Sequence, residues 1–261
     1  MKNAIMKLMP FVVGGGLGIL LFHPPAFLRE LGFGAYLVMG LLVAMLFVLF
    51  IGFLLLANFP ADLRLDAAAT ATVPAELQTM MSDLINAGFT MAGAPRSVGV
   101  APPALLVPFV HSSDPIYASL FRTGTVPAKV SYDCVSIFEG ERGGLTTGPD
   151  LAGTFVPGAP GSLRQVFPSA KPAQLLDHHR RGLAYLRTRG IEPRPVSSGT
   201  FDNDFRQAMS RGRRAFLQRP ILTTLVSVWR SLTRSTPHLG SIEKQSIAEK
   251  EIKDIIAGLT V

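Results

Sequence analysis

KVSYDCVSIFE, residues 129–139, is the stretch of sequence that decides the fold. Its side chains fall into two alternating sets. One set is Val130, Tyr132, Cys134, Ser136 and Phe138, and the other is Lys129, Ser131, Asp133, Val135 and Ile137. Because successive side chains of a β-strand point to opposite faces, this period of two predicts a strand.

Similar short segments lie on both sides of this strand. They are residues 89–96, 104–111 and 116–122 before it and 145–147 after it, separated by turn sequences such as HSSDP and GTVPA. The segment EGERGG is typical of a hairpin loop. The pattern predicts an antiparallel sheet of about four or five strands with a helix on one face, an α+β fold.

Helices are predicted on either side of these strands. Residues 74–87 carry an amphipathic stripe made of Leu77, Met80, Met81, Leu84 and Ile85. Further helices are expected at about 172–189, from Pro220 onward and at 241–257, where apolar residues recur at helical spacing, and a strongly basic helix is expected at 201–215. Residues 148–172, rich in Pro, Gly and Ser, are expected to form a long surface loop.

The N-terminal region is strongly apolar. AYLVMGLLVAMLFVLFIGFLLLANF, residues 35–59, has no charge and would reach roughly 35 Å as a helix, which predicts a membrane-spanning segment. A first membrane helix is predicted at about residues 5–22, ending at Pro24; a signal peptide and a re-entrant segment remain alternatives. The glycines expected to pack against other helices are Gly14, Gly18, Gly40 and Gly52.

Four regions follow from this organisation. They are a membrane anchor at 1–59, a linker at 60–73, an α+β soluble domain at 74–195 and a basic C-terminal helical region at 196–261. Lys2, Lys7 and Arg64 flank the apolar runs, whereas the loop between them carries only Arg29 as a cation. We expect the anchor to lie in a bacterial inner membrane. The positive-inside rule then predicts that both ends of the anchor, and the soluble domain, face the cytoplasm.

Arginine dominates the end of the chain. The formal net charge is +7, and nearly all of the surplus follows Arg164. The residues expected to contact a membrane surface or an acidic partner are Arg206, Arg211, Arg213, Arg214, Arg219, Trp229, Arg230 and Arg234. They surround an apolar stripe, which favours anionic lipid and integral membrane subunits ahead of nucleic acid. A helix docked on the sheet with a solvated basic side is the alternative.

No recognised catalytic motif is present. Cys134 is the single cysteine, so an internal disulfide is excluded and a buried structural thiol is expected. His178 and His179 are adjacent and point to different sides of a helix, which does not suit a metal pair. The segment FDNDF, residues 201–205, is better explained by N-capping of a helix than by a calcium loop. No catalytic residue, cofactor or metal is therefore predicted.

Several short motifs resemble a scattered class of uncharacterised bacterial membrane-anchored α+β domains. Its pattern is Leu-Gly-Phe after a helix, Phe-x-(Asp/Glu)-Gly, Leu-Thr-Thr and a His-Arg helix. The matching residues here are Ala87, Gly88, Phe89, Phe138, Glu139, Gly140, Leu145, Thr146, Thr147, His178, His179 and Arg180. The resemblance implies the α+β fold and no activity.

The leading functional hypothesis is a non-catalytic accessory subunit of a bacterial membrane protein complex, stabilising it from the cytoplasmic side. Energy-transducing and photosynthetic reaction-centre complexes are the expected kinds of assembly. The alternative is a membrane-tethered enzyme or ligand-binding domain whose site is assembled from scattered residues.

Overall fold

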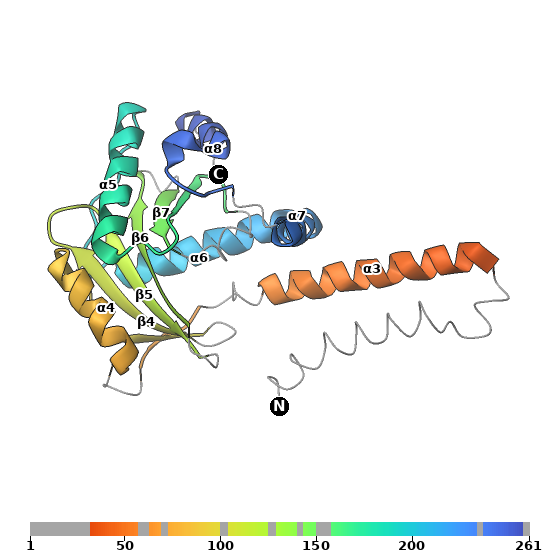
Figure 1. Cartoon of the computed structure of the whole chain (residues 1–261), viewed down its shortest axis with the longest axis horizontal. Helices are drawn as coiled ribbons and strands as arrows, with labels where there is room; N and C mark the ends of the chain where they lie inside the picture. Colours follow the sequence, from red (N-terminus) through yellow and green to blue (C-terminus); the bar gives the residue numbers. More distant parts are fainter. Residues whose placement is uncertain are drawn as a thin grey trace. The chain divides into compact units, whose positions relative to one another are not determined.

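The computed structural model describes residues 32–56, 63–68, 73–99, 104–124, 129–139, 143–149, 158–233 and 237–257. The chain divides into two compact units, Met1–Leu54 and Leu55–Val261. The described part of the first unit belongs to helix α3, Gly32–Leu56. Residues 55 and 56 of this helix are assigned to the second unit. The second unit holds the sheet and the other described helices, so its fold is a mixture of α and β structure (Figure 1).

The predicted transmembrane hairpin is wrong for the part of the chain that the structure describes. A helix does form near residues 35–59, as α3, but no described helix has both the length and the apolarity needed to cross a membrane. The helix predicted at 5–22 lies outside the described residues.

The described surface of α3 is apolar on every side. Large side chains such as Leu41 and Phe53 are 63% and 67% exposed. A Cβ placed on Gly40 would meet no described atom within 4 Å, and Gly52 is half-buried. Helix packing at these two glycines stays a prediction, while Gly14 and Gly18 lie outside the described residues.

The second unit is built on one sheet with the strand order β1-β3-β4-β5-β6-β7-β8, with β2 paired to β4 beside β3. The strands are β1 (Leu65–Ala67), β2 (Phe89–Met91), β3 (Arg96–Val98), β4 (Ala104–His111), β5 (Tyr117–Thr123), β6 (Lys129–Ile137), β7 (Gly144–Gly148) and β8 (Ser162–Val166). Neighbours are antiparallel except β7 and β8, which are parallel.

The sheet therefore has eight strands where four or five were predicted. β1 lies within the expected linker and β8 within the expected loop at 148–172. Both are short and lie among small or turn-forming residues, so their own sequence carries little strand signal. Each forms because a longer neighbour offers it hydrogen-bonding partners, β3 in one case and β7 in the other.

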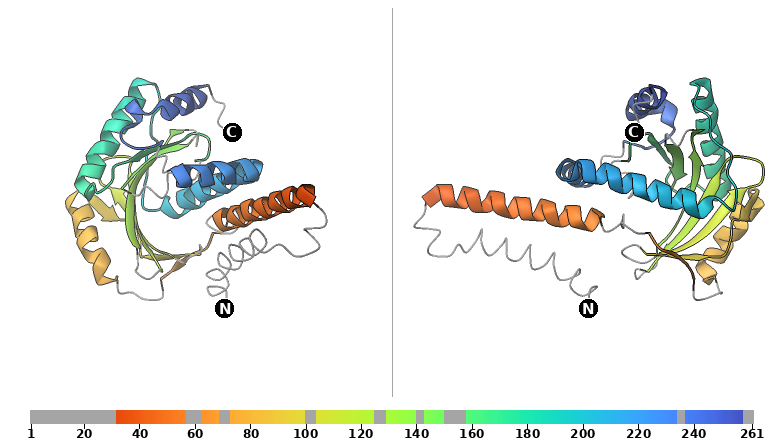
Figure 2. Two further views of the ribbon diagram at one scale, coloured as in Figure 1. Left: turned by 45° about the vertical axis from the view of Figure 1, so that its right-hand side comes forward. Right: turned by 180° about the vertical axis from the view of Figure 1, so that it is seen from behind.

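Both faces of the sheet are covered by helices. The outer face packs against α4 (Ala75–Asn86), α5 (Pro172–Thr188) and α8 (Ser246–Ile256), and the inner face packs against α6 (Phe201–Gln218), as Figure 2 shows. The alternation predicted for β6 is confirmed: Tyr132 and Cys134 join the outer core, whereas Val135 and Ile137 join the inner core.

Most helix positions predicted from periodicity are confirmed. The helix after Pro220 is α7 (Pro220–Thr233), and a short 3-10 turn, Ile242–Lys244, precedes α8. N-capping of α6 by the FDNDF segment is not observed, because the cap is Thr200 and makes no side-chain cap hydrogen bond. The two aspartates instead hold α6 to the unit, Asp202 through Arg96 (3.3 Å) and Asp204 through Arg194.

Tyr117 completes this attachment of α6. Its hydroxyl donates to Oδ2 of Asp204 at 2.7 Å and lies 2.7 Å from Oγ1 of Thr200. Burial raises the pKa of Tyr117 to about 12, with the nearby Asp204 carboxylate adding to the rise. Because the phenol stays protonated at ordinary pH, it keeps donating to Asp204. This hydrogen bond fixes the start of α6 on the inner face of the sheet.

Close packing of α5 on the sheet depends on Gly182. A Cβ at this position would lie 2.5 Å from Nε2 of Gln165 and 3.0 Å from Cδ2 of Leu145. Real Cβ atoms do not tolerate the first distance, and Gln165 is itself held in a buried hydrogen-bond network.

We predict that Gly182→Ala lowers the free energy of unfolding by about 1–3 kcal/mol, the usual cost of overpacking a filled core. This loss should exceed the gain of up to about 1 kcal/mol that alanine brings within a helix. Urea unfolding followed by circular dichroism measures the change. Gly199→Ala is the control, since the nearest atom to its Cβ is 4.0 Å away; equal effects of the two variants would contradict the packing explanation.

Candidate functional site: an arginine-rich helical surface and an inner-face cavity

Helices α6 and α7 carry the strongest charge bias in the chain. From Phe205 to Ile242 there is no aspartate or glutamate, while arginines recur throughout. A surface of this kind attracts anions.

The apolar side of α7 faces outward. Ile221, Leu222, Leu225 and Trp229 are between 47% and 67% exposed. The buried side instead carries Thr224 and Ser227. We call the four exposed residues the outer apolar face of α7.

The buried hydroxyls explain how this orientation is tolerated. Oγ1 of Thr224 donates to the carbonyl oxygen of Pro220 and Oγ of Ser227 to that of Thr223, both at 2.7 Å. Because each hydroxyl is satisfied within its own helix, burying it carries little penalty. An amphipathic helix of a water-soluble domain normally turns its apolar stripe to the core. The reversed orientation of α7 therefore makes its outer face a candidate binding surface.

The predicted contact residues divide into two groups. Arg206, Arg214, Arg219 and Trp229 are exposed, as membrane or partner contact requires. Arg211, Arg213 and Arg230 are partly buried. Arg211 lines a cavity under α6, and Nη1 of Arg230 is buried without a hydrogen-bond partner among the described residues. Arg234 lies outside the described residues.

The cavity lies between the inner face of the sheet and α6, with a volume of about 520 Å³. Its walls are mainly apolar, with Phe121 and Val135 from the sheet and Phe201, Phe205 and Met209 from α6. Its floor carries Ser119, Asp133 and Arg164 on β5, β6 and β8. We call this space the inner-face cavity.

Strand register brings the three floor residues together. Ser119 pairs directly with Asp133 across β5 and β6, and its hydroxyl hydrogen-bonds the Asp133 carboxyl. Val135 pairs with Thr146 and Thr146 with Arg164, which places Arg164 diagonally across the sheet from Asp133. Gly148 lies beside Asp133, with its Cβ position 3.6 Å from Cβ of Asp133.

Burial dominates the electrostatics of this floor. It raises the pKa of Asp133 to about 7, although the charge of Arg164 and the Ser119 hydrogen bond act in the opposite direction. Burial also lowers the pKa of Arg164, and the charge of Arg230 lowers it further. Sequence reasoning placed Asp133 on a strand but missed the cavity, because only the long-range pairing of β6, β7 and β8 reveals that Asp133 and Arg164 are neighbours.

A second polar cluster lies under α5 on the outer face. Nε2 of His179 is 2.9 Å from Oγ of Ser136, and Nδ1 is 2.8 Å from Oγ1 of Thr147. The Ser136 hydroxyl already donates to the carbonyl oxygen of Pro115 at 2.7 Å, so it accepts from Nε2–H of His179. Thr147 in turn accepts from Gln165 at 3.0 Å and donates to Nδ1. Every polar atom of this neutral imidazole is satisfied, so the cluster is structural.

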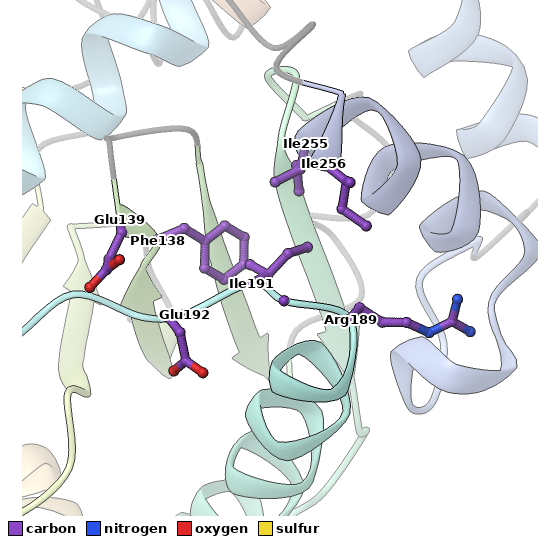
Figure 3. Close-up of a pocket in the computed structure, with 8 residues that line it drawn as sticks. Phe138, Glu139, Arg189, Ile191, Glu192, Ile255 and Ile256 are labelled. Atoms are coloured by element: carbon purple, nitrogen blue, oxygen red, sulfur yellow. The ribbon is translucent and has the colours of Figure 1, made fainter.

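A groove of about 500 Å³ opens at the end of α5, where Phe138, Ile191 and Ile255 face one another (Figure 3). Two of its charged residues are engaged in contacts with neighbouring side chains. Glu192 accepts from Arg187 at 3.2 Å, and Arg189 donates to the Tyr185 hydroxyl at 2.9 Å. The groove therefore combines these apolar side chains with charged residues at its rim, Glu139, Arg189 and Glu192.

Cys134 and the potential metal ligands were the remaining candidates for reactive chemistry. Cys134 is buried, and its burial raises the pKa of the thiol, which keeps it protonated and unreactive. Within the described ranges, no three histidine, cysteine, aspartate or glutamate side chains lie close enough to hold a metal ion.

Comparison with known proteins gives no match to any protein family, curated protein or solved structure. Function is therefore argued from the geometry of α6, α7 and the inner-face cavity.

We predict that acid weakens the fold through His179. Burial lowers the pKa of His179 from 6.5 to about 3. Between these values the unfolded chain binds a proton that the folded protein excludes, so the stability present above pH 6.5 falls by about 1.4 kcal/mol per pH unit on acidification. Urea unfolding of the wild type and of His179→Gln from pH 7 to 5 measures this slope.

The free energy of unfolding of His179→Gln should fall less steeply on acidification than that of the wild type. Glutamine does not titrate, while every other group, including His238, is retained. Parallel stability curves for the two proteins would show that His179 is not the group that limits acid stability.

Proposed function

We propose that this protein is a non-catalytic accessory protein of a bacterial inner membrane, where it binds anionic lipid on the cytoplasmic side through α7 and supports a membrane protein complex. The observation that carries the proposal is the reversed orientation of α7. Its outer apolar face is exposed while Thr224 and Ser227 are buried. A helix of this kind lies in the plane of a membrane interface with its apolar side among the acyl chains.

The flanking charges support lipid as the binding partner. Arg214 and Arg219 are exposed just before the outer apolar face, and no acidic residue lies between Phe205 and Ile242. Each arginine near an anionic leaflet contributes about 1 kcal/mol of attraction at ordinary salt. Trp229, 67% exposed at the far end of this face, suits the boundary between headgroups and acyl chains.

The exposed surface of α3 supports a role beside membrane proteins. Its described side chains are apolar on all sides, including Leu41 and Phe53. A continuous apolar surface of this kind favours an apolar protein partner, which the subunits of a membrane complex would provide.

We predict that Trp229 reports binding directly, because it is the single tryptophan of the chain. When the full chain is mixed with phosphatidylglycerol vesicles at low salt, its emission should shift to the blue, and the shift should reverse at high salt. With pure phosphatidylcholine vesicles the shift should be much smaller. Replacing Arg214 and Arg219 together by glutamine should weaken binding by about ten- to thirty-fold, given about 1 kcal/mol per arginine.

The matched control replaces Lys171 and Arg181 by glutamine. Both lie on or next to α5 at the outer face and are exposed, so the net charge changes equally. An unchanged Trp229 emission with anionic vesicles, or equal weakening by the two double variants, would refute the proposed role of α7.

A further inference from the structure

We propose that the inner-face cavity binds a neutral, mainly apolar small molecule with one polar group, such as an alkyl or aromatic alcohol. This inference goes beyond the proposed function and does not depend on α7 binding a membrane. It rests on the size of the cavity, on its apolar walls and on the engagement of its charged side chains within the protein.

The cavity is too large to be a packing defect. Its volume of about 520 Å³ lies within the range of small-molecule sites, about 300–1,000 Å³, whereas protein interiors hold few voids larger than a water molecule. Phe121 and Val135 on the sheet and Phe205 and Met209 on α6 present apolar side chains to the space. Walls of this kind offer water few hydrogen bonds, so an apolar occupant is favoured over water.

The charged side chains in the described lining of the cavity balance one another. They are two acids, Asp133 and Asp204, and two arginines, Arg164 and Arg211. Each of the two arginines has an interaction partner within the protein. The formal charges of the lining therefore cancel, and neither guanidinium group waits for an anion from outside.

The two acids are engaged as well. Asp204 accepts from the Tyr117 hydroxyl at 2.7 Å and from Arg194, and the Asp133 carboxyl is hydrogen-bonded by Ser119. A charged ligand would lose its hydration here without meeting a free opposite charge, which disfavours its binding. Oδ1 of Asp133 has no hydrogen-bond partner among the described residues, so a single ligand hydroxyl that donates to this oxygen would satisfy it.

Gly148 offers a specific way to fill the cavity. Along β7, Leu145 and Thr147 face the outer side of the sheet, whereas Thr146 and Gly148 line the cavity. A Cβ at Gly148 would meet Cβ of Asp133 and a backbone oxygen at 3.6 Å, which is ordinary van der Waals contact. A larger side chain at this position would therefore enter the cavity without displacing the backbone.

The test titrates the full chain with N-phenylnaphthylamine, an uncharged dye that fluoresces in apolar surroundings. Gly148→Leu should weaken dye binding by about ten- to one-hundred-fold, because the leucine occupies the space that the dye needs. The matched control is Gly199→Leu, which adds the same side chain at an exposed position, where the nearest atom to a Cβ is 4.0 Å away. Equal dye affinity of the two variants would overturn the proposal.

Competition with ligands of equal chain length tests the preference for a neutral group. Decanol, decanoate and decylammonium are added to displace the fraction of bound dye that Gly148→Leu removes, which separates the cavity from exposed apolar surfaces such as α3. Decanol should displace this dye at a lower concentration than either ion. If decanoate or decylammonium displaces it as well as decanol does, the cavity accepts a charged group and the proposal is wrong.

A second variant guards against a general loss of folding. Met209→Ala removes part of one wall but keeps a strong helix former in α6, and it should weaken dye binding by about three- to ten-fold through lost apolar contact. Circular dichroism and the blue shift of Trp229 with anionic vesicles should be retained in Met209→Ala and in Gly148→Leu. Unchanged dye affinity in Met209→Ala would show that the dye binds elsewhere, a result that leaves the proposed role of α7 untouched.

Discussion

Buried side chains alternate between the two faces of the sheet along β4, β5 and β6, and the rest of the structure depends on this constraint. Each of these strands must bury both of its faces, so helices are needed on both sides of the sheet. The outer face receives α4, α5 and α8 and forms a filled core. The inner face receives only α6 from the described helices that pack on it, and the space that α6 leaves over Asp133 and Arg164 becomes the inner-face cavity.

The attachment of α6 links this constraint to the binding surface. Tyr117 on the inner face and Arg194 hold Asp204 in the first turn of α6, which sets the direction of that helix. α7 follows directly after Arg219 and is held mainly by the same helix. Its polar side faces inward and Arg230 is partly buried, so the outer apolar face remains exposed. A single arrangement of helices therefore creates both candidate sites.

Local pattern was sufficient to predict the elements that carry strong periodicity. The two faces of β6 and the positions of α4, α5 and α7 were recognisable because their apolar residues repeat at the period of their own secondary structure. The position of α6 was predicted from its arginine-rich sequence. β1 and β8 were not recognisable, because three- and five-residue strands depend on partners distant in sequence. The membrane-spanning interpretation of residues 35–59 followed hydropathy alone, and the described helix does not support it.

The candidate sites show the same division. The basic character of α6 and α7 and the role of Trp229 could be proposed from composition, but the exposure of the apolar face required the structure. Asp133 and Arg164 are ordinary residues in the sequence and become a site only through strand register. The most direct measurement of membrane binding by α7 is spin labelling of single cysteines along this helix in the presence of phosphatidylglycerol vesicles. Labels at Leu222 and Leu225 should gain oxygen accessibility and lose exposure to aqueous nickel complexes, while a label at Arg181 stays in water. If the α7 labels remain as water-exposed with vesicles as without them, α7 does not bind the membrane and the account fails.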